Sequence, residues 1–153
     1  MIVVSDTSAI TALLQVDRAA LLQQLYGEVL IPEAVRDELQ RTHAALPPFV
    51  RCQHVLDAAH VQRLLGELDI GEAEAIVLAK ESRADVLLID DLEGRRVARR
   101  EGVPFIGLLG VLVQAKQMGH IPSVRQLTAE LERLAGFHLS AEVKEVAFRK
   151  AGE

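Results

Sequence analysis

The chain has 153 residues, of which 50% are hydrophobic and 3% aromatic, and its only cysteine is Cys52. This length suits one domain with an aliphatic core, and one cysteine excludes an internal disulfide framework or a cysteine zinc cluster. The net charge of -5 is opposite in sign to the basic surface expected of a nucleic-acid-binding protein.

Strand and helix patterns alternate along the first half of the chain. A β-branched run predicts a strand at residues 2–4, and the Asp and Ser residues that follow are favourable helix N-caps. The further elements expected here are helices over 9–14 and 18–26, a strand at 29–31 and a helix that starts with Pro32 in its first turn and continues over 33–41. They are followed by an ambiguous extended segment at 49–55, read as an edge strand, and a helix over 57–68.

The second half continues the alternation and ends in helices. We expect a helix over 71–82, a strand at 86–89, a helix over 92–101, a strand at 105–106 and helices over 108–118, 124–135 and 140–150. The alternation indicates parallel strands joined by right-handed crossovers. The expected fold class is therefore α/β, with three α/β/α layers around a short, mainly parallel sheet. We expect one domain over 1–153, with a core at 1–119 and a C-terminal helical extension at 120–153.

Nothing in the sequence predicts export or membrane insertion. The first residues lack the basic segment of a signal peptide. The longest apolar run, 103–113, is interrupted by Pro104, Gly107 and Gly110 and is shorter than the roughly 20 residues that span a bilayer. We expect a cytoplasmic protein.

Acidic residues follow two of the predicted strands. Asp6 follows the strand at 2–4, and the pair Asp90 and Asp91 follows the strand at 86–89. Ligands bind to such sheets just beyond the carboxyl ends of the strands. Each aspartate could instead serve only as the N-cap of the next helix, because Asp is favoured there.

Three glutamates extend this set. Glu38 borders the apolar stripe of its helix, although it could also be a surface carboxylate paired with Arg36 or Arg41. Glu72 shares a helix face with apolar residues. Glu74, about 200° further round the helix, leads to the charged residue Glu81. Glu72 is thus favoured as a ligand over Glu74, although acids in a first helical turn also stabilise the helix dipole.

A common reason for these inward acids would be a divalent cation. Crowded carboxylates repel one another, and Mg²⁺ prefers oxygen ligands and commonly bridges to phosphates. Excluding Asp6, Glu38, Glu72, Glu74, Asp90 and Asp91 leaves 16 acidic residues against 17 Lys plus Arg, so most of the net charge lies in this candidate site. A metal would offset it, and the charge is therefore only weak evidence against a nuclease.

A basic helix face follows the second acidic pair. Arg95, Arg96, Arg99 and Arg100 recur at spacings that gather them on the helix over 92–101. As phosphate contacts they would position RNA without reading its sequence. They could equally form a solvated face paired with Glu93 and Glu101.

These residues together resemble the PIN domain superfamily, close to its VapC-like branch of small prokaryotic proteins. The similar segments occur in family order and are VVSDTSAI at 3–10, IPEAVRDEL at 31–39, GEAEAI at 71–76, LLIDD at 87–91 and RRVA at 95–98. The resemblance covers most of residues 1–113, whereas the C-terminal helices look like a variable addition.

The resemblance implies a metal-dependent endoribonuclease for single-stranded RNA, often a dimeric toxin held by an antitoxin protein. It implies that Asp6, Glu38, Glu72 and Asp90 hold Mg²⁺ or Mn²⁺, with Thr7, Ser8, Glu74 and Asp91 assisting or substituting. One alternative is a PIN-fold binding module with little catalytic activity. A phospho-acceptor signalling domain is disfavoured, because no Lys or Thr stands at a late strand end.

Overall fold

The computed structural model describes residues 1–153 and confirms the α/β class with three layers. Its sheet contains five strands, all paired in parallel, in the order β3-β2-β1-β4-β5. Their bounds are β1 Val3–Ser5, β2 Val29–Ile31, β3 Val50–Cys52, β4 Val86–Leu88 and β5 Phe105–Ile106. The ambiguous segment at 49–55 therefore contains the edge strand β3.

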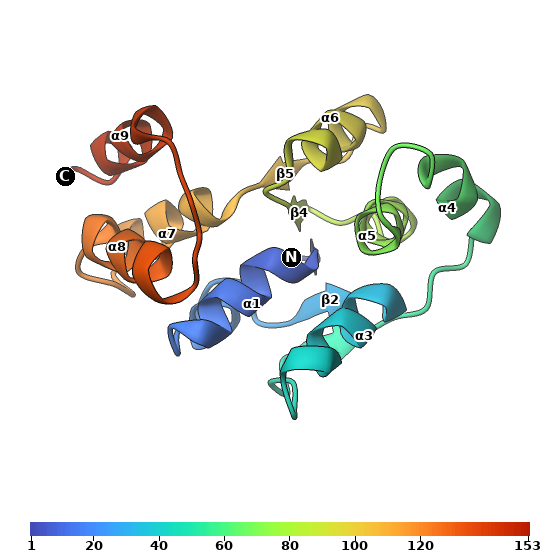
Figure 1. Ribbon diagram of the computed structural model, residues 1–153, viewed down its shortest axis with the longest axis horizontal. Coiled ribbons are helices and arrows are strands. Elements are labelled where there is room, and N and C mark those ends of the chain that lie inside the picture. The colour runs from blue at the N-terminus through green and yellow to red at the C-terminus, as the bar shows by residue number, and fades with distance from the viewer.

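Nine helices surround this sheet and lie close to their predicted positions. Figure 1 shows α4, α5 and α6 on one side of the strands and α7, α8 and α9 on the other. The helices are α1 Thr7–Gln15, α2 Ala20–Tyr26, α3 Glu33–Thr42, α4 Ala58–Leu64, α5 Ile70–Glu81, α6 Leu92–Arg100, α7 Leu108–Gln117, α8 Val124–Leu134 and α9 Ala141–Lys150. None of them is long and apolar enough to cross a membrane.

Alternating strand residues supply two separate apolar cores. Val3 and Leu88 join the core formed with α1, α2 and α7, whereas Val4 and Leu87 join the core formed with α4, α5 and α6. This alternation follows from the two-residue period of a strand. Because both sheet faces are covered, the inner strands β1, β2 and β4 are largely buried and mostly apolar, whereas the edge strand β3 exposes Arg51 and Cys52.

The order of the strands determines where a ligand could bind. β1 is central, with β2 and β3 added on one side of it and β4 and β5 on the other. The connections from β1 and from β4 therefore run towards opposite edges of the sheet. Such a switch point leaves a crevice beyond the strand ends. Asp6 directly follows β1 and the pair Asp90 and Asp91 lies just after β4, so all three begin at the edge of the sheet where that crevice lies.

The C-terminal helices share the main core. Leu127 and Leu131 of α8 and Phe148 of α9 are buried in the same apolar cluster as α1 and α7. The division into a core at 1–119 and an extension at 120–153 remains a prediction, but the extension contributes to the packing of the whole domain.

Glu153 fastens the end of the chain to α8. Its carboxylate accepts hydrogen bonds from the Val124 and Arg125 backbone N–H groups at 2.6 and 3.0 Å and from the Ser123 hydroxyl, and it pairs with Lys116 at 3.0 Å. Although partial burial opposes ionisation, these bonds lower the pKa of Glu153 to about 2.

We expect Glu153→Gln to destabilise the fold by about 1–2 kcal/mol at pH 7, because a charged acceptor is lost. Because the pKa of Glu153 is lower in the folded than in the unfolded chain, its carboxylate stabilises the fold at pH values above the unfolded pKa. That stabilisation disappears as the pH falls from about 4.5 towards 2. Urea unfolding of both proteins at pH 7 and pH 2.5 measures this. A difference that does not shrink at the lower pH would contradict the assignment.

Candidate functional site

Asp6 is a buried carboxylate at the end of the central strand. Its backbone N–H donates to Leu88 O of β4 at 3.0 Å, and the residue is only 8% exposed. Burial raises the pKa of Asp6 to about 7, against the opposing effect of a hydrogen bond from the Thr7 N–H. Asp69, Glu38 and Asp91 raise it further, which places their charges near Asp6.

Glu72 reaches the same region from the first turn of α5. Asp69 is the N-cap of this helix and accepts from Glu72 N at 2.9 Å, while Glu72 Oε1 accepts from Asp69 N at 3.4 Å, which completes a capping box. Glu72 is 8% exposed. Burial, the neighbouring Asp69 and a hydrogen bond shared with Asp91 raise the pKa of Glu72 to about 8.

Gly71 shows how closely the acids approach one another. A Cβ placed on this glycine would lie 2.7 Å from Glu38 Oε1, 3.6 Å from Asp69 Oδ1 and 3.7 Å from Asp6 Oδ1. Three carboxylate oxygens, from the residue after β1, from α3 and from the N-cap of α5, therefore lie around one point. Because Gly71 has no Cβ, the Glu38 carboxylate can approach the backbone of α5 at this point.

Asp90 and Asp91 have different environments. Asp90 accepts from Leu108 N at 3.0 Å, at the start of α7, and pairs with Arg95 at 3.4 Å. Burial raises the pKa of Asp90, and these two partners oppose the shift. Asp91 caps α6 by accepting from Gly94 N at 2.9 Å, and its charge acts on Asp6 and Glu72. Asp91 therefore faces the other acids, whereas Asp90 faces α7.

These acids line a cleft of about 410 Å³, called the acidic cleft below. Its carboxylates are Asp6, Glu38, Asp69, Glu72 and Asp91, and no Lys or Arg lines it. The remaining lining residues are Thr7, Ser8, Thr11, Ala12, Gln15, Ala135 and Phe137. The last two come from the segment after α8, so the C-terminal part of the chain forms one wall of the cleft.

The acidic cleft fits a hard divalent cation by its chemistry. All of its charged groups are oxygen donors, and the Thr7 Oγ1 beside them is buried without a hydrogen-bond partner. As they stand, however, no three His, Cys, Asp or Glu side chains are grouped closely enough to hold an ion. Binding would therefore require the flexible carboxylates to move towards one another.

The structure brings together only part of the predicted set. Asp6, Glu38, Glu72, Asp91, Thr7 and Ser8 line the acidic cleft, whereas Asp90 and Glu74 do not. Glu74 instead accepts from Ala34 N of α3 at 3.0 Å, and it is half-buried and not fully solvated. Asp69 was missed, although its position three residues before Glu72 is the spacing of a capping box.

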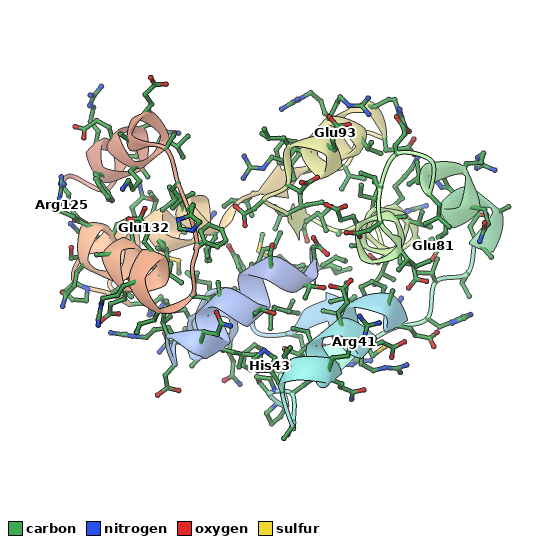
Figure 2. The ribbon with its side chains drawn as sticks, in the orientation of Figure 1. Arg41, His43, Glu81, Glu93, Arg125 and Glu132 are labelled. Carbon is green, nitrogen blue, oxygen red and sulfur yellow. The ribbon has the colours of Figure 1, made fainter.

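The four arginines of α6 divide into two pairs. Arg96 and Arg100 bind Glu67, at 2.9 and 2.7 Å, a partner that the sequence did not indicate. Glu93, on the outer side of α6 in Figure 2, also pairs with Arg96. Arg95 and Arg99 instead lie over the Phe105 ring, 5.6 and 5.2 Å from its centre. Their predicted contact with RNA remains a prediction.

Comparison with known proteins identifies the family. The family model DUF3368, described as a PIN domain, matches residues 2–153. No curated protein matches the chain. The matched range includes α8 and α9, which the sequence resemblance alone did not cover.

We expect Asp6→Asn to stabilise the metal-free protein at high pH. A pKa raised from 3.8 to about 7 means that the folded state retains a proton that the unfolded state releases, so stability falls as pH rises between these values. In EDTA, the melting temperature of the variant should exceed that of the wild type at pH 8, with the advantage shrinking towards pH 4. A difference independent of pH would contradict this.

Proposed function

Since this chain belongs to the PIN domain family, whose fold is of the nuclease type and whose members usually depend on divalent metals, we propose that it is an endoribonuclease. Its substrate would be single-stranded RNA, cut at phosphodiester bonds by water with the help of Mg²⁺ or Mn²⁺. The observation that carries this proposal is the convergence of five carboxylates in a cleft that contains no basic residue.

The proposed ligands are Asp6, Glu38, Glu72 and Asp91, with Asp69 beside them. Bound divalent cations supply an activated water and neutralise charge on the phosphate and the leaving oxygen. Asp91 is preferred to Asp90 because it faces the other acids and because Arg95 already neutralises Asp90. Without a cation, Asp6 and Glu72 hold protons near neutral pH, which lessens the repulsion in the cleft.

The remaining assignments form part of the same proposal. Arg95 and Arg99, which are not held by Glu67, would contact RNA phosphates near the cleft, and Arg96 and Arg100 would contribute after exchanging that partner. As a VapC-like toxin, the protein would act in the cytoplasm as a homodimer under the control of an antitoxin protein.

A second function is supported by one specific observation. The acids are not grouped closely enough to hold an ion as they stand, which is the arrangement expected of a PIN-fold module that binds RNA or protein without cutting. RNA that is retained by the protein in EDTA but stays intact in Mn²⁺ would favour this module over the nuclease.

The nuclease proposal predicts metal-dependent cleavage that requires Asp6. Purified protein with Mn²⁺ should cleave a fluorescent single-stranded RNA. EDTA, which removes the metal, or Asp6→Asn, which removes one of its ligands, should reduce the rate by about 100-fold or more. A loss of this order is typical when one group that stabilises the transition state is removed. Gel analysis of the products measures the rate. Equal activity in the variant would indicate a contaminating nuclease.

The two aspartates after β4 should differ when each is changed to Asn. Asp91→Asn should reduce cleavage more, because its charge lies beside Asp6 and Glu72. Asp90→Asn should lower the melting temperature more, because Asp90 accepts from the first N–H of α7, that of Leu108, and neutralises Arg95. Rates and melting curves of the two variants test both statements, and the opposite ranking would restore Asp90 as the ligand.

A further inference from the structure

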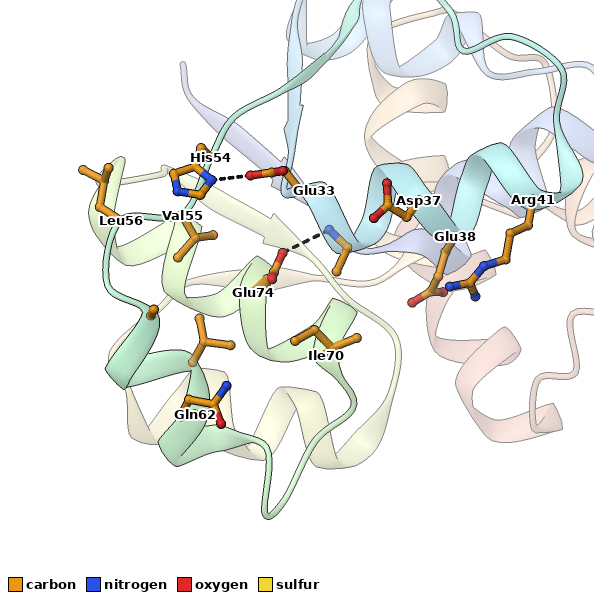
Figure 3. Close-up of a pocket in the computed structure, with 13 residues that line it drawn as sticks. Glu33, Asp37, Glu38, Arg41, His54, Val55, Leu56, Gln62, Ile70 and Glu74 are labelled. Carbon is orange, nitrogen blue, oxygen red and sulfur yellow. Dashed lines mark hydrogen bonds and ion pairs between the residues drawn. The ribbon is translucent and has the colours of Figure 1, made fainter.

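A second cavity opens beside the acidic cleft. It has a volume of about 530 Å³ and lies between α3, α4 and α5, as Figure 3 shows. Glu38 lines both this cavity and the acidic cleft, so the two spaces are adjacent and share that side chain as a common wall. The apolar part of its wall consists of Ala34, Val55, Leu56, Ala58, Val61 and Ile70.

Glu74 is the best-oriented acceptor in this cavity. Its Oε1 accepts from the Ala34 backbone N–H at 3.0 Å, and no group of the chain donates to its Oε2. The helix N-terminus of α3 therefore holds the carboxylate in place, while Oε2 and the second lone pair of Oε1 can accept further hydrogen bonds. Of the other acids, Glu33 contacts His54 and Asp37 binds Arg36, whereas Glu38 is shared with the acidic cleft and no backbone group holds it in place.

The lining selects against phosphate. Four carboxylates, Glu33, Asp37, Glu38 and Glu74, line the cavity, against Arg41 and His54 as its only basic side chains. A phosphate would be repelled by the carboxylates, and they offer it no hydrogen-bond donor. A group with flat apolar faces and N–H donors on its edge satisfies both the apolar wall and the acceptors. Nucleobases that carry an exocyclic amino group have these properties.

We propose that this cavity binds one nucleobase of the RNA strand next to the phosphate that is cut, and that Glu74 selects guanine. Guanine presents two adjacent donors, N1–H and the 2-amino group, to a carboxylate. Uracil presents a single N–H between two acceptor oxygens, which a carboxylate repels. The inference rests on the proposed function, since it is the acidic cleft that places a scissile phosphate beside Glu38.

Binding can be measured separately from cleavage in an Asp6→Asn background with Mg²⁺. The probes are four labelled uracil octamers in which one central base is G, A, C or U, and fluorescence anisotropy gives the affinities. We expect guanine to bind most tightly and uracil least, by about fivefold or more, as for a bidentate base contact. Adding Glu74→Gln should reduce the ratio of guanine to uracil to below about twofold, since one acceptor becomes a donor.

Two further variants separate recognition from general effects. Ala58→Phe fills the cavity from the exposed start of α4 and should abolish any base preference while the melting temperature is retained. Glu145→Gln removes one exposed charge on α9, outside the cavity, and should keep the full preference.

Several results would overturn the base-binding site: equal affinities for the four octamers, no binding to any of them, tightest binding of uracil, or a guanine preference that survives Glu74→Gln. Absence of cleavage by the protein with Asp6 intact would refute the nuclease alone. The affinity ratios would still decide whether the cavity binds a base.

Discussion

Burial of ionisable carboxylates beyond the central strands is the constraint on which the site depends. Asp6 and Glu72 are each only 8% exposed, and burial is the largest cause of the raised pKa of both. A charged carboxylate removed from water costs several kcal/mol unless it is paired or protonated. No lysine or arginine lines the acidic cleft to neutralise these carboxylates.

The same acids also begin the helices that enclose the cleft. Asp69 caps α5 and Asp91 caps α6, so the orphan N–H groups of two helix starts partly offset the negative charge. Capping and cation binding are therefore compatible uses of these side chains. Because Asp6 and Glu72 lack such full compensation, they are the residues whose charge most needs an external cation.

Most of the fold could be predicted from the sequence because its signals are local. Apolar runs, Pro32 and the glycines located nearly every element, and helical phase separated Glu72, which lines the cleft, from Glu74, which does not. Asp69 was not predicted as a site residue, because the predicted helix began at Gly71, whereas α5 begins at Ile70 and has Asp69 as its N-cap.

Contacts between distant residues could not be predicted in this way. Asp90 turns towards Leu108 N, 18 residues later, and the arginines of α6 meet Glu67, about 30 residues earlier. Neither pairing has a periodic signature. For the same reason the sequence did not show that Ala135 and Phe137, beyond the predicted core, form a wall of the acidic cleft.

Calorimetric titration of the protein with Mn²⁺ tests the central claim most directly, when it is repeated at pH 7 in two buffers that differ in ionisation enthalpy. If the buried carboxyls hold protons and bind the cation, the account predicts saturable binding with release of protons at pH 7, less release at pH 9, and a smaller release for Asp6→Asn. Absence of binding, or binding without proton release at pH 7, would contradict it.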